Sequence, residues 1–240
     1  MKRATLARIA LLGAAVAVLT TDCATTLPLA PSGPLPMVPP VPPAAPVPEG
    51  DGTGLRVAIV GDSLTAGGGR LLSDGLNAKT WITYAQGDGV NYVGGWARGG
   101  STVQDQAAAV RPIPDVDVLV LMSGTNDVRL GIGFAESRAS YESIIRTIDA
   151  HQVVVAAIPP YDRKPQDALR YGAELGRWVG TTNHAFVDPW LDVRVGDTWR
   201  EGESADGIHP TTSGYARLGQ VLRDAILAAG SEIHAQESTE

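Results

Sequence analysis

The stretch Leu55–Leu64, with the sequence LRVAIVGDSL, constrains the fold of this 240-residue chain more than any other. An apolar, partly β-branched run from Val57 to Val60 leads into a Gly-Asp-Ser turn. A short apolar run that ends in a turn is typical of a strand buried on both faces of a parallel sheet. Residues just past such a strand lie at the carboxyl edge of the sheet, where α/β proteins place their sites. Ser63 is therefore predicted to lie at that edge, although a single Gly-Asp-Ser can also be turn chemistry alone.

The rest of the globular sequence alternates strand-like and helix-like segments. Apolar residues spaced three and four apart predict one helix over Phe134–Ile148 and a last helix around Tyr215–Ile226 that ends at Gly230. Strands that alternate with helices through short connections form a parallel sheet covered on both faces, so we predict an α/β fold with a three-layer α/β/α arrangement. Strands after the first are predicted at Asn91–Trp96, Val116–Met122, Gln152–Ile158 and Ala185–Val187.

The amino terminus differs in composition from this globular part. Lys2, Arg3 and Arg8 precede an apolar run over Ile9–Leu19. A membrane span needs ~20 apolar residues, whereas a basic start followed by a shorter run is typical of a signal peptide. A buried amphipathic helix is the alternative, but the run has no polar face. We therefore predict a signal peptide within residues 1–26 and an exported protein, either secreted or associated with the cell envelope.

The single cysteine, Cys23, lies in the sequence LTTDC, which resembles a bacterial lipobox. The cysteine of that motif carries a lipid, but Asp22 occupies a position where the motif has a small residue. We favour export without a lipid on Cys23, and membrane or cell-wall association through the N-terminal segment is the alternative. One cysteine provides no disulfide framework, so the cysteine content indicates no compartment.

Residues 27–54 hold most of the 17 prolines of the chain. Proline fixes φ and cannot donate to a strand ladder, so this segment is predicted to be an extended spacer. A ligand for proline-binding domains is the alternative. The globular domain is predicted over residues 55–230, followed by a polar tail over 231–240. The net charge of −7 and pI of about 5.1 argue against a nucleic-acid partner, and we expect a monomer.

Polar residues gather where the predicted strands end and where the last helix begins. Each group taken singly can be a glycine turn or an Asx cap. Together they place a nucleophile, a base, a carboxylate and hydrogen-bond donors at one edge of one sheet. The four groups are GDSL at 61–64, RGGST at 98–102, SGTND at 123–127 and DGIHP at 206–210.

These residue types suit nucleophilic catalysis. The hydroxyl of Ser63 becomes an effective nucleophile only when an imidazole removes its proton, and His209 is the candidate base. Asp206, three residues earlier, can bind the other ring nitrogen and fix the tautomer. The tetrahedral intermediate also needs donors for its oxyanion. The candidates are the backbone N–H groups of Ser63 and Gly100 and the side-chain amide of Asn126.

In these four blocks and their order, the chain resembles the SGNH hydrolases of the GDSL esterase/lipase family. The resemblance covers nearly all of residues 55–230. It implies a flavodoxin-like fold with a parallel sheet of about five strands, and hydrolysis of esters with no metal or organic cofactor. It also implies the roles given above for Ser63, Gly100, Asn126 and His209. The second block departs from the family pattern, because Ala97-Arg98 stand where an asparagine is usual, which leaves Gly99 as an alternative to Gly100.

Other functions were weighed against this resemblance. The α/β-hydrolase elbow G-x-S-x-G fails because Thr65 stands at its last position. A phosphate loop built on the glycines at 67–69 lacks the Gly-Lys-Ser/Thr that should follow it. A metal site needs a cluster of ligands, and chelator sensitivity would reveal one. Its candidate ligands are Asp62, Asp127, Asp206 and His209.

The substrate is less constrained than the reaction. The expected partner is a small-molecule, glycan or lipid ester. Trp96, Trp190 and Trp199 lie near the predicted site loops, where they can stack on a sugar, line an acyl pocket or simply cap the core. An acyltransferase that uses the same acyl-enzyme, and a carbohydrate-binding module without catalysis, are the alternative functions.

Overall fold

A computed structural model describes residues 54–67 and 71–237. The predicted signal peptide, Cys23 and nearly all of the proline-rich spacer lie outside these residues. Within them, no helix combines the length and the apolar composition that a bilayer span requires.

Five strands of the described part form one parallel sheet in the order β2-β1-β3-β4-β5. The chain adds β2 on one side of β1 and then crosses to the other side for β3, so the order reverses between β1 and β3. Ligands of open α/β sheets bind at the carboxyl ends of the strands beside such a reversal. The strands are β1 Leu55–Gly61, β2 Val90–Ala97, β3 Val118–Met122, β4 Gln152–Ala156 and β5 Ala185–Val187.

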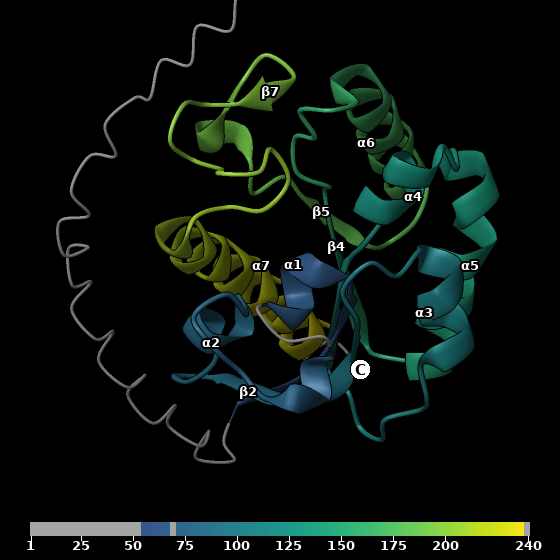
Figure 1. The fold of residues 1–240 in the computed structure, drawn as a ribbon. Coiled ribbons are helices and arrows are strands. Elements are labelled where there is room, and N and C mark those ends of the chain that lie inside the picture. Colours follow the sequence, from purple (N-terminus) through teal and green to yellow (C-terminus); the bar gives the residue numbers. More distant parts are fainter. Residues whose placement is uncertain (1–53, 68–70, 238–240) are drawn as a thin grey trace, which may run out of the picture. The chain divides into compact units, whose positions relative to one another are not determined.

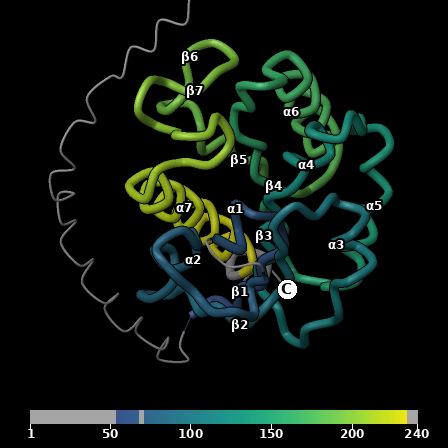
Figure 2. The backbone as a smooth tube through the Cα atoms, viewed as in Figure 1, coloured from purple at the N-terminus to yellow at the C-terminus, as the bar shows by residue number. Residues whose placement is uncertain are grey.

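Helices cover both faces of this sheet (Figures 1 and 2). Alternate residues of β1 serve the two faces: Val57 and Ile59 pack in one core cluster, and Ala58 and Val60 pack in the other. The predicted three-layer α/β/α fold is therefore confirmed. The first cluster lies under α1 Ser63–Ala66, α2 Ile82–Ala85 and α7 Thr212–Glu237, and the second under α3 Val103–Ala109, α4 Thr125–Leu130, α5 Phe134–Ile148 and α6 Pro165–Val179.

Short elements complete the described part. They lie in the connections after β1 and after β5, outside the parallel sheet. They are the 3₁₀ helices η1 Leu72–Asp74 and η2 Leu191–Val193, and a two-stranded antiparallel hairpin of β6 Arg194–Val195 and β7 Thr198–Trp199.

The predicted end of the last helix at Gly230 is wrong, because α7 continues to Glu237. The helix therefore includes residues 231–237 of the segment expected to be a polar tail. A Cβ atom at position 230 would clash with the side chain of Leu55. The glycine allows α7 to pack closely against the start of β1 and is not a stop signal.

Candidate active site

A tight strand-to-helix turn places Ser63 at the carboxyl end of β1. A Cβ at Gly61 would lie 2.7 Å from the carbonyl oxygen of Met122 on the neighbouring β3, so only glycine fits this turn. Asp62 is the N-cap of α1, and its Oδ1 accepts a hydrogen bond of 3.0 Å from the backbone N–H of Leu64. Ser63 is then the first residue of α1, and its own backbone N–H has no partner within the helix.

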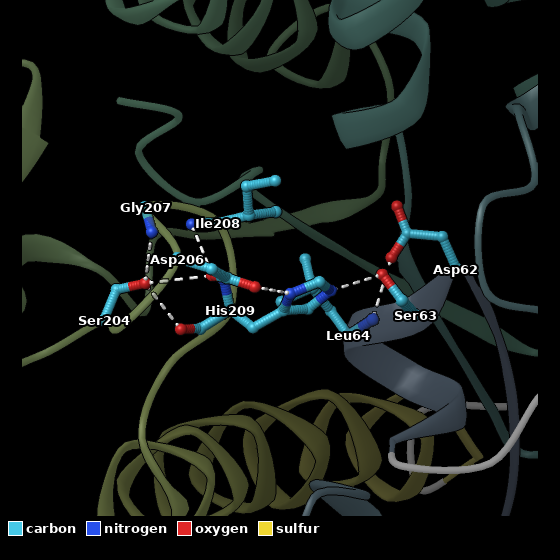
Figure 3. Close-up of polar contacts among 8 residues, drawn as sticks. All are labelled: Asp62, Ser63, Leu64, Ser204, Asp206, Gly207, Ile208 and His209. Atoms are coloured by element: carbon cyan, nitrogen blue, oxygen red, sulfur yellow. Dashed lines mark hydrogen bonds and ion pairs between the residues drawn. The ribbon is translucent and has the colours of Figure 1, made fainter. Parts of the chain in front are cut away.

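The structure brings together the three residues predicted to form a catalytic triad (Figure 3). The Oγ of Ser63 lies 2.8 Å from Nε2 of His209, and Nδ1 of His209 lies 2.7 Å from Oδ2 of Asp206. Since a carboxylate only accepts, Nδ1 carries the ring proton and the lone pair of Nε2 faces the serine hydroxyl. This is the tautomer that a general base for Ser63 requires.

The loop before α7 is held in shape by two side chains (Figure 3). Oδ1 of Asp206 accepts the backbone N–H groups of Ile208 and His209, at 3.0 and 2.8 Å. Oγ of Ser204 donates to the carbonyl oxygen of His209 at 2.7 Å and accepts the N–H of Gly207 at 3.0 Å. Ser204 did not emerge from the sequence, because its role depends on a loop closing back on itself.

The same hydrogen bonds set the charge of Asp206. Partial burial acts to raise the pKa of its carboxyl group, but the bonds from the side chain and backbone of His209 and from the backbone of Ile208 outweigh it and lower the pKa to about 2. Asp206 is therefore ionised at any pH near neutrality. Its charge can stabilise an imidazolium that forms on His209.

The turn after β2 runs beside Ser63. A Cβ at Gly99 would lie 3.9 Å from the Cβ of Ser63. Gly100 has a φ of +80°, in the left-handed region that favours glycine, and the space around its missing Cβ is open. The contact with Ser63 is thus made at Gly99, the alternative donor, and the predicted donor Gly100 is the next residue of the same turn.

Asn126, the other predicted donor, is the second residue of α4 and is buried. Its Nδ2 lies 3.4 Å from Oδ2 of Asp62, the residue next to the nucleophile. The N-cap of α4 is Gly124, with a φ of +113°, and a Cβ there would lie 2.5 Å from the ring of Tyr171. A residue with a side chain therefore does not fit at the N-cap of α4, two positions before Asn126.

Comparison with known proteins agrees with this geometry. The model of the GDSL-like lipase/acylhydrolase family matches residues 59–217. The chain belongs to this family. The match contains all five residues of the proposed triad and oxyanion site, and it makes this GDSL protein a member of a family of ester-hydrolysing enzymes.

Solved structures similar to this GDSL protein share its fold at low identity. A GDSL-like lipase from Bacteroides thetaiotaomicron is 20% identical with a TM-score of 0.54, over 72% of this chain and 88% of that one. A carbohydrate esterase family 3 protein from Talaromyces cellulolyticus is 17% identical with a TM-score of 0.53, over 74% and 99%. An acetylxylan esterase from Geobacillus stearothermophilus is 19% identical with a TM-score of 0.51, over 74% and 95%. The curated protein sequences contain no match.

Two buried carboxylates of this GDSL protein lie behind the site. Burial raises the pKa of Asp62 to about 6, against the opposing effects of the Leu64 N–H and of His209. Burial also raises the pKa of Asp127, against bonds from Ser137 Oγ at 2.6 Å and from the Val103 N–H at 3.1 Å. Asp127 thereby ties α4 to the starts of α3 and α5.

The sequence allowed a metal site built from Asp62, Asp127, Asp206 and His209. In the described ranges, no group of three or more His, Cys, Asp or Glu side chains is arranged to hold a metal ion. Both buried carboxylates instead accept backbone N–H groups at helix starts.

Two of the three tryptophans considered as ligand contacts belong to the core. Trp190 and Trp199 are buried with their rings edge-to-face at 5.5 Å, and Nε1 of Trp190 donates to the carbonyl oxygen of Ala157 at 2.7 Å. For these two, the core alternative is correct. Trp96 is half-buried, and the guanidinium of Arg98 lies 5.6 Å from its ring centroid.

A cavity of about 390 Å³ opens at the carboxyl ends of β4 and β5, between α6 and the β6–β7 hairpin. Leu169 and Phe186 contribute apolar walls, and Arg177 and Asp197 contribute polar ones. Neither Ser63 nor His209 lines this cavity. This cavity is therefore not formed by the triad residues Ser63 and His209.

Proposed function

We propose that this chain is an exported serine esterase that hydrolyses carboxylic esters through an acyl-enzyme on Ser63. The observation that carries the proposal is the unbroken hydrogen-bonded row from Ser63 through His209 to Asp206. Membership of an ester-hydrolysing family supports the reaction class. A carbohydrate-binding module without catalysis has no need of a serine paired with an oriented imidazole.

In the proposed reaction, Oγ of Ser63 attacks the ester carbonyl carbon while Nε2 of His209 takes the hydroxyl proton. The negative charge moves to the former carbonyl oxygen, where the N–H groups of Ser63 and Gly100 and the amide of Asn126 can bind it. Collapse of the intermediate expels the alcohol, which leaves with the proton from His209. Water, with His209 again acting as base, then attacks the acyl-enzyme and releases the acid.

The substrate is proposed to be an acyl lipid or an acylated carbohydrate. The similar structures include a lipase and an acetylxylan esterase, which supports both substrate classes. The experiment is a comparison of turnover by the purified chain on p-nitrophenyl esters of increasing acyl length, on acetyl-xylan and on acylated glucosides. If turnover requires an acceptor alcohol, the proposal of a hydrolase is replaced by that of an acyltransferase. Absence of turnover on every one of these esters would refute the proposal of an esterase.

Export is proposed from the basic and apolar start of the sequence. A cleaved signal peptide would remove at least the first ~20 residues, which the intact mass of protein from the envelope or culture medium would reveal. A full-length intracellular protein contradicts export. A diacylglyceryl mass on Cys23 would contradict our preference for an unlipidated protein.

Replacing Asn126 by alanine tests the oxyanion role. A bond to the oxyanion strengthens only as negative charge develops, so Asn126→Ala should lower kcat by ~10²–10³ with little change in KM. Steady-state kinetics on p-nitrophenyl acetate, together with thermal unfolding, measure the effect. A variant that unfolds much earlier while its folded fraction keeps a normal kcat would make Asn126 a turn residue.

A further inference from the structure

The side-chain amide of Asn126 has a hydrogen-bond donor beside its oxygen and a hydrogen-bond acceptor beside its nitrogen. Nε of Arg129 lies 3.0 Å from Oδ1 of Asn126, and Oδ2 of Asp62 lies 3.4 Å from Nδ2. A guanidinium can only donate hydrogen bonds, and at pH values above its pKa of about 6 the Asp62 carboxyl group is ionised and can only accept them. Rotating the amide by half a turn would place a donor against Arg129 and an acceptor against Asp62. The two partners together therefore specify one orientation of Asn126.

This orientation is the one that an oxyanion donor needs. One hydrogen of Nδ2 points to Asp62, which leaves the other for a substrate oxygen. Donation from a charged guanidinium to Oδ1 also withdraws electron density from the amide and makes Nδ2–H a stronger donor. We propose that Arg129 is a positioning residue for ester hydrolysis, which acts by fixing and polarising the side chain of Asn126.

The short helix α4 brings Arg129 to this position. Arg129 follows Asn126 by three residues, which is about one helical turn, so both side chains lie on the same side of α4. Nζ of Lys164 donates to the carbonyl oxygens of Val128 and Arg129, at 3.1 and 3.0 Å, and holds the last turn. Gly131, with a φ of +80°, then ends the helix. The backbone under Arg129 is thus fixed independently of its side chain.

The exposure of Arg129 makes the inference testable without disturbing the core. Arg129 is an exposed residue, and Asn126 is buried. Arg129→Met keeps most of the length of the side chain and removes its donors. The matched control is Arg138→Met, because Arg138 is also exposed and helical and pairs with Glu142 at 2.9 Å on α5. Neither variant removes a residue that would touch the substrate.

The inference rests on the proposed function, so the experiment is a double-mutant cycle with Asn126→Ala on p-nitrophenyl acetate. Arg129→Met should lower kcat about tenfold, as loss of one charge-assisted hydrogen bond would, with KM and the melting temperature close to those of Arg138→Met. In a protein that already carries Asn126→Ala, Arg129→Met should not lower kcat further, because the amide that Arg129 positions is absent.

Two results overturn the role of Arg129 while leaving the esterase intact. One is an unchanged kcat in Arg129→Met, and the other is an equal loss of kcat in the presence and absence of Asn126. A wild-type protein that hydrolyses no ester would instead overturn the proposed function and this inference with it. An Asn126→Ala variant with a normal kcat would remove the oxyanion role of Asn126, and with it the role of Arg129, but not the serine mechanism. The wild type and the Asn126→Ala variant therefore separate the two failures.

Discussion

Ser63→Ala is expected to lower kcat by on the order of 10⁶-fold, close to the limit set by removal of a triad nucleophile. The variant keeps the site's other hydrogen-bonding groups but has no atom that can form the acyl-enzyme. Its fold should be unaffected, because the serine Oγ bonds to His209 and serves no packing role that a methyl group cannot fill. Initial rates on p-nitrophenyl acetate, with thermal unfolding alongside, measure both effects.

Ser231→Ala is the matched control for this variant. Ser231 is an exposed serine near the end of α7, where the helix packs against the start of β1 and not against its carboxyl end. It should keep the wild-type rate. A Ser63→Ala variant with a rate near that of Ser231→Ala would rule out the serine mechanism.

The central strands β1, β3 and β4 could be predicted because they are largely buried and have apolar sequences, as strands covered on both faces do. The residues at which these strands end could not be predicted equally well. Ala157 and Ile158 continue the apolar run of β4 and are buried, but the strand stops at Ala156. Apolar sequence reports burial, whereas a strand ends where backbone pairing ends, and the two need not coincide.

Helix α6 was not predicted, although its residues carry the spacing of an amphipathic helix. Ala168, Tyr171, Leu175 and Trp178 are buried and spaced three or four residues apart, and Pro165 stands at the first helical position. The last helix was recognised by the same spacing, but its end was misplaced. A glycine in a helix can signal a stop or a close contact, and only the packing of Gly230 on Leu55 distinguishes the two.

Some contacts of the proposed site could be predicted from the sequence and others could not. Asp206 and His209 are near in sequence, so their pairing is a local property of one loop. Ser63 contacts His209 although 146 residues separate them, because the fold of the sheet brings the carboxyl end of β1 beside the loop before α7. The contact of Arg129 with Asn126 depends on side-chain directions within α4, which no residue pattern in the sequence specifies.

His209→Ala should be nearly as damaging as Ser63→Ala, with a loss of kcat on the order of 10⁶-fold. Without Nε2 as a proton acceptor at 2.8 Å, the serine hydroxyl is a poor nucleophile at neutral pH. The Ser63→Ala, His209→Ala double variant should lose little more than either single variant, because the two side chains act as one unit. Losses that multiply in the double variant would contradict this pairing.

Asp206→Ala should cost less, about 10⁴-fold in kcat, because the imidazole remains and only its orientation and charge partner are lost. With the pKa of Asp206 at about 2, the carboxylate is ionised throughout the range from pH 6 to pH 9. The ratio of wild-type to Asp206→Asn rates at saturating substrate should therefore show no step from titration of residue 206 itself in that range. Rate profiles of both proteins measure the ratio. A wild-type rate that changes with protonation of Asp206 near neutrality would contradict a carboxylate held in its charged form by the N–H groups of Ile208 and His209.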